Sequence, residues 1–192
     1  MRLDKAQRKV AAHVRRFFDG QEVTIDRWST GPIEERVPGF AVARVGPGPK
    51  LPGLWTYVSL GCWTATHEDE HGLEFALVGA KNDPRLVELL ALTAFYHCGP
   101  ESQRLALGHT VPIGEPWLPG SSCDHLLVSL PYPFGPELEV CNWRGGHARV
   151  LWLLPISDSE REHMVTDGQE QLEQLFDSRG VRYWDPARSP VA

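Results

Sequence analysis

The stretch VLWLL at residues 150–154 decides the fold, because all of its side chains are apolar. A strand with one face in water alternates apolar and polar residues, whereas a strand covered on both faces is apolar throughout. We therefore predict a central strand at 147–155 that is covered on both faces. The segment LWTYVSL at 54–60 alternates instead, which is typical of a half-buried strand.

Further strands are expected where short runs of β-branched and aromatic residues stand between Gly and Pro turns. In chain order the expected strands are 22–28, 40–45, 55–61, 73–78, 105–111, 126–130, 138–142 and 147–155. The chain shows no internal repeat and no low-complexity tract. These turns therefore punctuate one unit and do not link separate domains.

We expect three helices. The first precedes the strands, and the second stands between the strands at 73–78 and 105–111. Apolar residues at helical spacing, with bases between them, predict an amphipathic helix at 3–18. Asp83 in the N-cap position and Pro84 in the first helical position predict a helix at 84–97. The apolar face of this second helix should lie against the sheet.

The third expected helix is acidic. A capping box of Ser157 and Glu160 begins it, it runs towards Gly180, and Gly168 weakens or kinks it. Helices at the start, middle and end, with strands between them, predict an α+β fold. We expect a mixed, mainly antiparallel sheet packed by helices.

Length and composition indicate the domain organisation. At 192 residues, with 42% hydrophobic and 23% charged residues, the chain has ordinary globular values and the length for one domain with a proper core. We expect a basic amphipathic helix at residues 1–20, packed on a single globular domain at 21–188.

Charge is unevenly distributed along the chain. Residues 1–16 carry a net charge of +5, so the other residues carry −11 and the whole chain −6. Phosphate contacts need clustered Lys and Arg, so we expect no nucleic-acid partner. The acidic body favours a basic protein as the partner.

The cysteines and the apolar runs indicate the compartment. Cys62, Cys98, Cys123 and Cys141 form no C-x-x-C pair, and we interpret them as reduced core thiols. The longest apolar stretch, at 150–156, is far shorter than the roughly 18 residues of a membrane span. We predict a cytoplasmic protein with no membrane partner and no cofactor.

One motif suggests catalysis. In HEDEH at 67–71, an H-E-x-x-H pattern, His67 and His71 would hold zinc and Glu68 would activate a water molecule. That mechanism needs a helix, and this segment lacks apolar periodicity and stands between two expected strands. We prefer an acidic loop without metal, and a zinc-dependent hydrolase is the alternative. No nucleophile elbow or phosphate-binding loop is present, so we assign no catalytic residue.

Seven segments in order carry a family resemblance over residues 25–188. They are WTYVSLG at 55–61, HGLEFAL at 71–77, LTAFY at 92–96, LGH at 107–109, VLWLLPI at 150–156, the helix at 160–175 and Asp185-Pro186-x-Arg188. Together they resemble the suppressor-of-fused domain family. The resemblance implies a suppressor-of-fused-like fold and a binding domain that is not an enzyme.

The resemblance also bears on the partner. Animal members sequester a zinc-finger transcription factor through a peptide, and some bacterial members look like immunity proteins that neutralise a cognate toxin. Phe95 and His109 stand where the animal pattern has a recognition Tyr and an Asp, which indicates a different ligand. The leading hypothesis is an intracellular protein-binding domain, specifically an immunity protein, and a regulator that binds an endogenous basic protein is another alternative.

The residues expected to contact a partner combine aromatic and acidic side chains. Aromatic residues are enriched in binding hot spots, and acids attract a basic protein over long range. The predicted contact residues are Tyr96, His109, Trp117, Glu170 and Glu173. The oligomeric state is left open.

Overall fold

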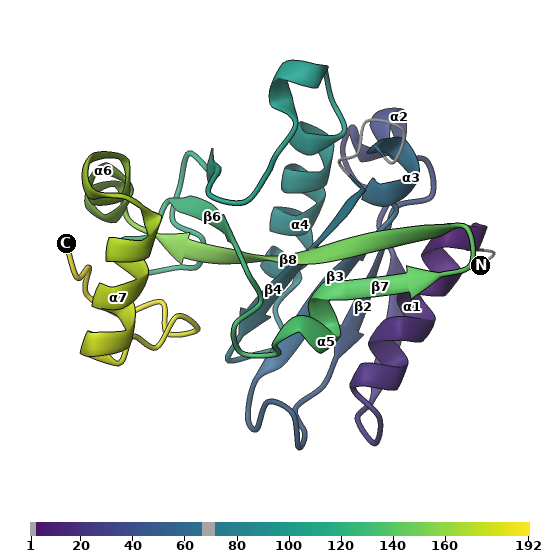
Figure 1. Cartoon of the computed structure of the whole chain (residues 1–192), viewed down its shortest axis with the longest axis horizontal. Helices are drawn as coiled ribbons and strands as arrows, with labels where there is room; N and C mark the ends of the chain where they lie inside the picture. Colours follow the sequence, from purple (N-terminus) through teal and green to yellow (C-terminus); the bar gives the residue numbers. More distant parts are fainter. Residues whose placement is uncertain (1–2, 67–71) are drawn as a thin grey trace.

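One sheet forms the framework of the protein in the computed structural model, which describes residues 3–66 and 72–192. Its strands in these ranges are Val23–Arg27 (β1), Ala41–Val45 (β2), Trp55–Leu60 (β3), Leu73–Gly79 (β4), Thr110–Pro112 (β5), His125–Ser129 (β6), Val140–Trp143 (β7) and Gly146–Ile156 (β8). Their order across the sheet is β1-β2-β3-β4-β8-β6-β5. Strand β7 pairs with β8 outside that path (Figure 1).

The sheet is mixed and mainly antiparallel, as predicted. Strands β4 and β8 run parallel, with Leu73 opposite Arg149 and Ala76 opposite Trp152. The other pairs of neighbouring strands are antiparallel. The long β8 strand contacts β4 and β7 with its first half and β6 with its second half, so it joins the two parts of the sheet (Figure 1).

Helices cover both faces of this sheet. They are Lys5–Phe17 (α1), Ile33–Arg36 (α2), Cys62–Thr66 (α3), Pro84–His97 (α4), Pro136–Glu139 (α5), Asp158–Asp167 (α6) and Gln169–Arg179 (α7), with a 3₁₀ turn at Glu101–Gln103 (η2). Helix α4 crosses the centre of one face. On the other face α1 covers the β1–β4 side of the sheet and α7 covers the β6–β8 side.

The β8 strand is the central strand that the apolar run predicts. Each side chain from 150 to 154 is at most 5% exposed. Because successive side chains of a strand point to opposite faces, Leu151 and Leu153 join the core under α4, whereas Trp152 and Leu154 join the core under α7. The unbroken apolar run therefore reflects helices on both faces.

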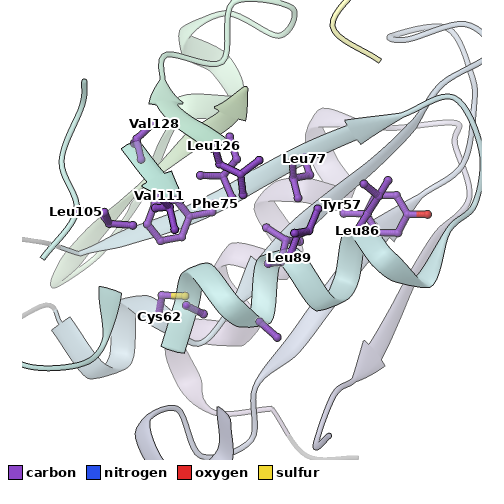
Figure 2. Packing of buried hydrophobic residues seen from close by; sticks show 14 of the residues in the cluster. Tyr57, Cys62, Phe75, Leu77, Leu86, Leu89, Leu105, Val111, Leu126 and Val128 are labelled. Atoms are coloured by element: carbon purple, nitrogen blue, oxygen red, sulfur yellow. The ribbon is translucent and has the colours of Figure 1, made fainter. Parts of the chain in front are cut away.

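Buried hydrophobic residues form three clusters among the described residues, under α4, α1 and α7, and the cluster under α4 is the largest. Figure 2 shows Leu86 and Leu89 of α4 beside Leu77 of β4 and Tyr57 of β3. All four of these side chains are fully buried. Burying a side chain of this size stabilises the fold by roughly 1.5–3 kcal/mol, so this one contact layer supplies much of the drive for α4 to dock on the sheet.

The first two expected helices are confirmed. Helix α4 spans 84–97, and the Asp83 carboxylate accepts a hydrogen bond from the backbone N–H of Arg85 at 2.9 Å. Helix α1 begins one residue after Asp4, which forms a capping box with Gln7. Val10 and Val14 of α1 are fully buried on the sheet, so the basic side chains point away from it.

Three sequence predictions need correction. Gly168 adopts φ +103°, a conformation that side chains disfavour, so it ends α6 and begins α7 where one kinked helix was expected. Gly108, at φ +84°, likewise interrupts the strand expected at 105–111, and β5 is only Thr110–Pro112. Pro136 begins a helical turn, so the strand expected at 138–142 starts at Val140.

Candidate functional site

A cleft of about 490 Å³ opens beneath α7, on the face of the sheet opposite α4. Its walls come from the end of β6, the loop that follows β6, the second half of β8, helix α7 and the segment after that helix. We refer to it as the acidic cleft. It lies within the range of about 300–1,000 Å³ that is typical of ligand sites.

The floor of the acidic cleft is apolar. Trp152 and Leu154 reach it from β8, and Phe176 reaches it from α7. Leu172, one helical turn before Phe176, is fully buried against the same strands and fixes the helix on the sheet. The ring of Tyr183 packs edge-on against Trp152 with 4.4 Å between the ring centroids.

The end of α7 is what brings Tyr183 back over the sheet. Gly180 adopts the left-handed conformation with φ +60°, which ends the helix. The backbone N–H of Val181 then donates to the carbonyl of Phe176 at 2.9 Å, which turns the chain towards β8. Val181 and Tyr183 both line the acidic cleft as a result.

The segment after Tyr183 is anchored by a buried ion pair. The Arg188 guanidinium donates to both carboxylate oxygens of Glu160 at 2.7 Å, and the two side chains are 7% and 0% exposed. It also donates to the carbonyl of Pro155 at 2.9 Å. These bonds tie the C-terminal segment to the start of α6 and so hold the wall of the cleft in place.

The rim of the acidic cleft carries three carboxylates: Glu170, Glu173 and Asp177. The Glu173 carboxylate accepts hydrogen bonds from the Ser129 hydroxyl at 3.0 Å, the Tyr132 hydroxyl at 2.9 Å and the Gln169 amide at 2.7 Å. All three donors are neutral. They fix the position of the negative charge without compensating it.

No basic residue lines the acidic cleft, and within residues 3–66 and 72–192 none of its three carboxylates forms an ion pair. The pKa of the Tyr132 hydroxyl is raised to about 12. Desolvation is the largest cause, followed by the hydrogen bond to Glu173 and the negative charges of the rim. The phenol therefore stays protonated and keeps donating to Glu173 at neutral pH.

The predicted contact residues divide into three groups. Glu170 and Glu173 lie on the rim of the acidic cleft. His109 is exposed just before β5. A Cβ atom added at the preceding Gly108 would lie 2.9 Å from the Gln169 amide oxygen, so this loop adjoins the start of α7. Tyr96 is 36% exposed on α4, on the opposite face.

The prediction for Trp117 is wrong. Its side chain is 1% exposed and packs in the core under α4, so it cannot contact a partner. The reason is the large apolar surface of an indole, which the loop after β5 buries against the sheet. The structure therefore unites Glu170 and Glu173, places His109 nearby and leaves Tyr96 and Trp117 elsewhere.

Sequence reasoning missed several lining residues, among them Asp177, Trp152 and Tyr132. Asp177 had a detectable signal, because positions 170, 173 and 177 follow the three- and four-residue spacing of one helix face. Trp152 was expected to be buried but not to line a cleft. Tyr132 gave no signal, since it stands in an irregular Pro-rich loop.

A buried carboxylate elsewhere has a structural role. Glu74 of β4 is 1% exposed and accepts hydrogen bonds from the Ser59 hydroxyl at 2.6 Å and from the backbone N–H groups of Gly61 at 2.8 Å and Trp63 at 3.2 Å. Burial raises the pKa of Glu74 to about 7, against these hydrogen bonds, which lower it. The contacts hold the start of α3 against the sheet.

The proposed zinc ligands His67, Glu68 and His71 lie outside the described residues. In the two described ranges, no group of three or more His, Cys, Asp or Glu side chains is placed to hold a metal ion. The four cysteines carry free thiols, and Cys98 is the one that is half-buried rather than buried. No helix in those ranges has the length and apolar character that crossing a membrane requires.

The fold and the acidic cleft define an α+β domain that carries three carboxylates around an apolar floor. The family described as Suppressor of fused protein (SUFU) matches residues 37–189. A crystal structure of a SUFU homologue from Neisseria gonorrhoeae FA 1090 has a TM-score of 0.83 and 34% identity, over 97% of each chain. The chain belongs to the suppressor of fused family.

Two further solved structures share the fold. One is a Sufu–Fu complex, with a TM-score of 0.73 and 15% identity over 97% of this chain and 92% of that one. The other is Drosophila Suppressor of Fused, with the same score and identity over 97% of this chain and 51% of that one. No curated protein matches the chain. At 15% identity these likenesses establish the fold and nothing more.

Proposed function

We propose that this chain is a non-catalytic, intracellular domain that binds a basic protein partner through the acidic cleft. The observation that carries the proposal is the rim of Glu170, Glu173 and Asp177, since no basic residue among the described positions 3–66 and 72–192 lines the cleft. An uncompensated anionic site over an apolar floor favours a cation that also buries apolar surface. The structure of the Sufu–Fu complex shares this fold, and we extend binding of a protein partner from that complex to this chain as part of the proposal.

In its specific form the proposal is that the chain is an immunity protein and the partner a basic toxin, such as a nuclease. The overall charge of −6 supports this, because an acidic surface speeds association with a basic protein and masks the groups that the toxin uses on nucleic acid. Regulation of an endogenous basic protein is the rival role. The two roles differ in whether the partner is toxic when it is expressed alone.

The immunity role predicts that a gene beside this one encodes a large secreted protein, and the test begins with that protein. Its C-terminal domain should bind the chain in a pull-down, and co-expression should rescue cells from that domain. A variant with Glu170→Gln, Glu173→Gln and Asp177→Asn should lose both effects. Absence of binding and of rescue with the wild-type chain would refute the immunity role.

A matched control separates the acidic cleft from net charge. Asp19, Glu101 and Glu162 are exposed and do not line the cleft. A variant with Asp19→Asn, Glu101→Gln and Glu162→Gln changes the net charge by the same amount as the cleft variant. It should bind and protect like the wild type, because the rim provides the contact and three charges outside it add little to the attraction at physiological salt.

A further inference from the structure

The side chains of the acidic cleft indicate which class of cation it binds. This inference rests on the proposed function. The rim offers acceptors in fixed positions, since Glu173 is held by three neutral donors. A preorganised acceptor loses little conformational freedom when it binds, which favours a ligand that matches its geometry. A planar, forked donor such as a guanidinium makes paired bonds to carboxylates, whereas an ammonium is a point charge.

The aromatic walls point to the same ligand. Tyr132 is 58% exposed at the cleft, and Tyr183 is half-buried in its wall. Guanidinium groups stack on aromatic faces and are more weakly hydrated than ammonium groups, so they lose less on entering such a site. The apolar floor beneath them suits the three methylene groups of an arginine side chain.

An independent observation concerns the indole of Trp152. This side chain is 4% exposed and lines the acidic cleft, and its Nε1–H has no hydrogen-bond acceptor in the part of the chain that the structure describes. A buried N–H without a partner costs about 1–3 kcal/mol. An indole N–H only donates, so an acceptor such as a peptide carbonyl would satisfy it.

We propose that the acidic cleft binds one arginine residue of the partner protein. The guanidinium contacts the rim carboxylates Glu170, Glu173 and Asp177, and the methylene groups cover the apolar floor. A backbone carbonyl of the partner segment accepts from Trp152. Because Trp152 is 4% exposed, this contact requires a local displacement of the side chains that cover the indole N–H.

The experiment uses three capped peptides that differ in one side chain: acetyl-Ala-Arg-Ala-amide, its citrulline analogue and its lysine analogue. Citrulline keeps the shape of arginine and removes its charge. Binding to the full chain is followed by ¹H–¹⁵N NMR of the tryptophan indoles, with the Trp152 signal identified in a Trp152→Phe variant. The arginine peptide should shift that signal and bind about tenfold more tightly than either analogue.

Two variants test the assignment to the rim. Glu173→Gln should weaken binding of the arginine peptide about tenfold, and Asp177→Asn should weaken it by a smaller factor because that residue is exposed. Glu162→Gln should leave it unchanged. Because Glu173 also contacts three side chains, the Asp177 variant keeps the test valid if the Glu173 variant fails to fold.

Equal affinity for the citrulline peptide would refute a charge-based site, and equal affinity for the lysine peptide would refute the choice of arginine. A bound arginine peptide that leaves the Trp152 indole signal unmoved would refute the carbonyl contact. If no peptide binds while a basic partner still does, this inference fails and the proposed function stands. If the arginine peptide binds and no basic protein does, the proposed function fails and the arginine site stands.

Discussion

The substitution Arg188→Ala should destabilise the protein strongly, because it leaves a buried carboxylate without its counter-ion. Arg188 and Glu160 form two hydrogen bonds of 2.7 Å, with side-chain exposures of 7% and 0%. Removing one partner of a buried ion pair costs about 3–5 kcal/mol. Glu160 would retain the backbone N–H groups of Ser157 at 2.9 Å and Val191 at 3.1 Å, so we expect the lower end of that range.

The free energy of unfolding is measured by guanidinium titration, with thermal unfolding as a second readout. A loss of about 3 kcal/mol corresponds to a fall in Tm of about 6–12 °C for a domain of this size. Arg182→Ala is the matched control on the same segment, because its ion pair with Asp185 spans 3.8 Å and its side chain is 70% exposed. That control should change stability by less than about 0.5 kcal/mol.

A loss below about 1 kcal/mol for Arg188→Ala would refute the reasoning, since a pair that weak does not anchor the segment. The double variant Glu160→Gln with Arg188→Met gives a second check. It removes both charges together, so it should be more stable than Arg188→Ala alone. The same anchor holds Tyr183 against the cleft, so Arg188→Ala should also weaken partner binding.

Three further predictions concern the core, the buried carboxylate and salt. Leu172→Ala removes the fully buried contact of α7, and should lower the free energy of unfolding by about 2–5 kcal/mol in a guanidinium titration. Because the pKa of Glu74 is about 7 in the fold and 4.5 is its ordinary value, the folded protein retains a proton that the unfolded chain releases as pH rises. The free energy of unfolding of the wild type should therefore fall by about 3 kcal/mol relative to that of Glu74→Gln between pH 4.5 and 7. Above pH 7 the two free energies should change in parallel, and urea titrations across the whole range measure both. A constant difference between the two proteins would contradict the raised pKa. Raising the ionic strength from 0.05 to 0.5 M should slow association with the basic partner at least tenfold in stopped-flow measurements, whereas a salt-independent rate would argue against the acidic rim.

The central strand and the helix at 84–97 could be predicted because their determinants are local. An unbroken apolar run needs cover on both faces, and Asp83 with Pro84 sets the start of a helix wherever the chain goes. The break at Gly168 was less predictable. A Gly inside a helical pattern is compatible with a kink or with the start of a new helix. Only the packing of α7 on the sheet, through its own Leu172 and Phe176, decides between the two.

The acidic cleft depends on residues that are distant in sequence. Glu170 and Glu173 could be predicted from the charge of one helix, but the floor under them comes from Trp152 and the opposite wall from Tyr132. These residues meet only because β6 pairs with β8 and α7 folds back over both strands. Trp117 failed as a prediction for the same reason, since the burial of a single loop residue depends on its distant neighbours.

The central claim is that the rim of the acidic cleft binds a basic protein. Isothermal titration calorimetry of the basic partner protein, which the immunity role predicts to be the C-terminal domain of a secreted protein encoded next to this chain, against three forms of the chain tests it most directly. The wild type and the control variant with Asp19→Asn, Glu101→Gln and Glu162→Gln should share one Kd. The cleft variant with Glu170→Gln, Glu173→Gln and Asp177→Asn should bind about 100-fold more weakly. Equal Kd values for the cleft variant and its control would contradict the claim.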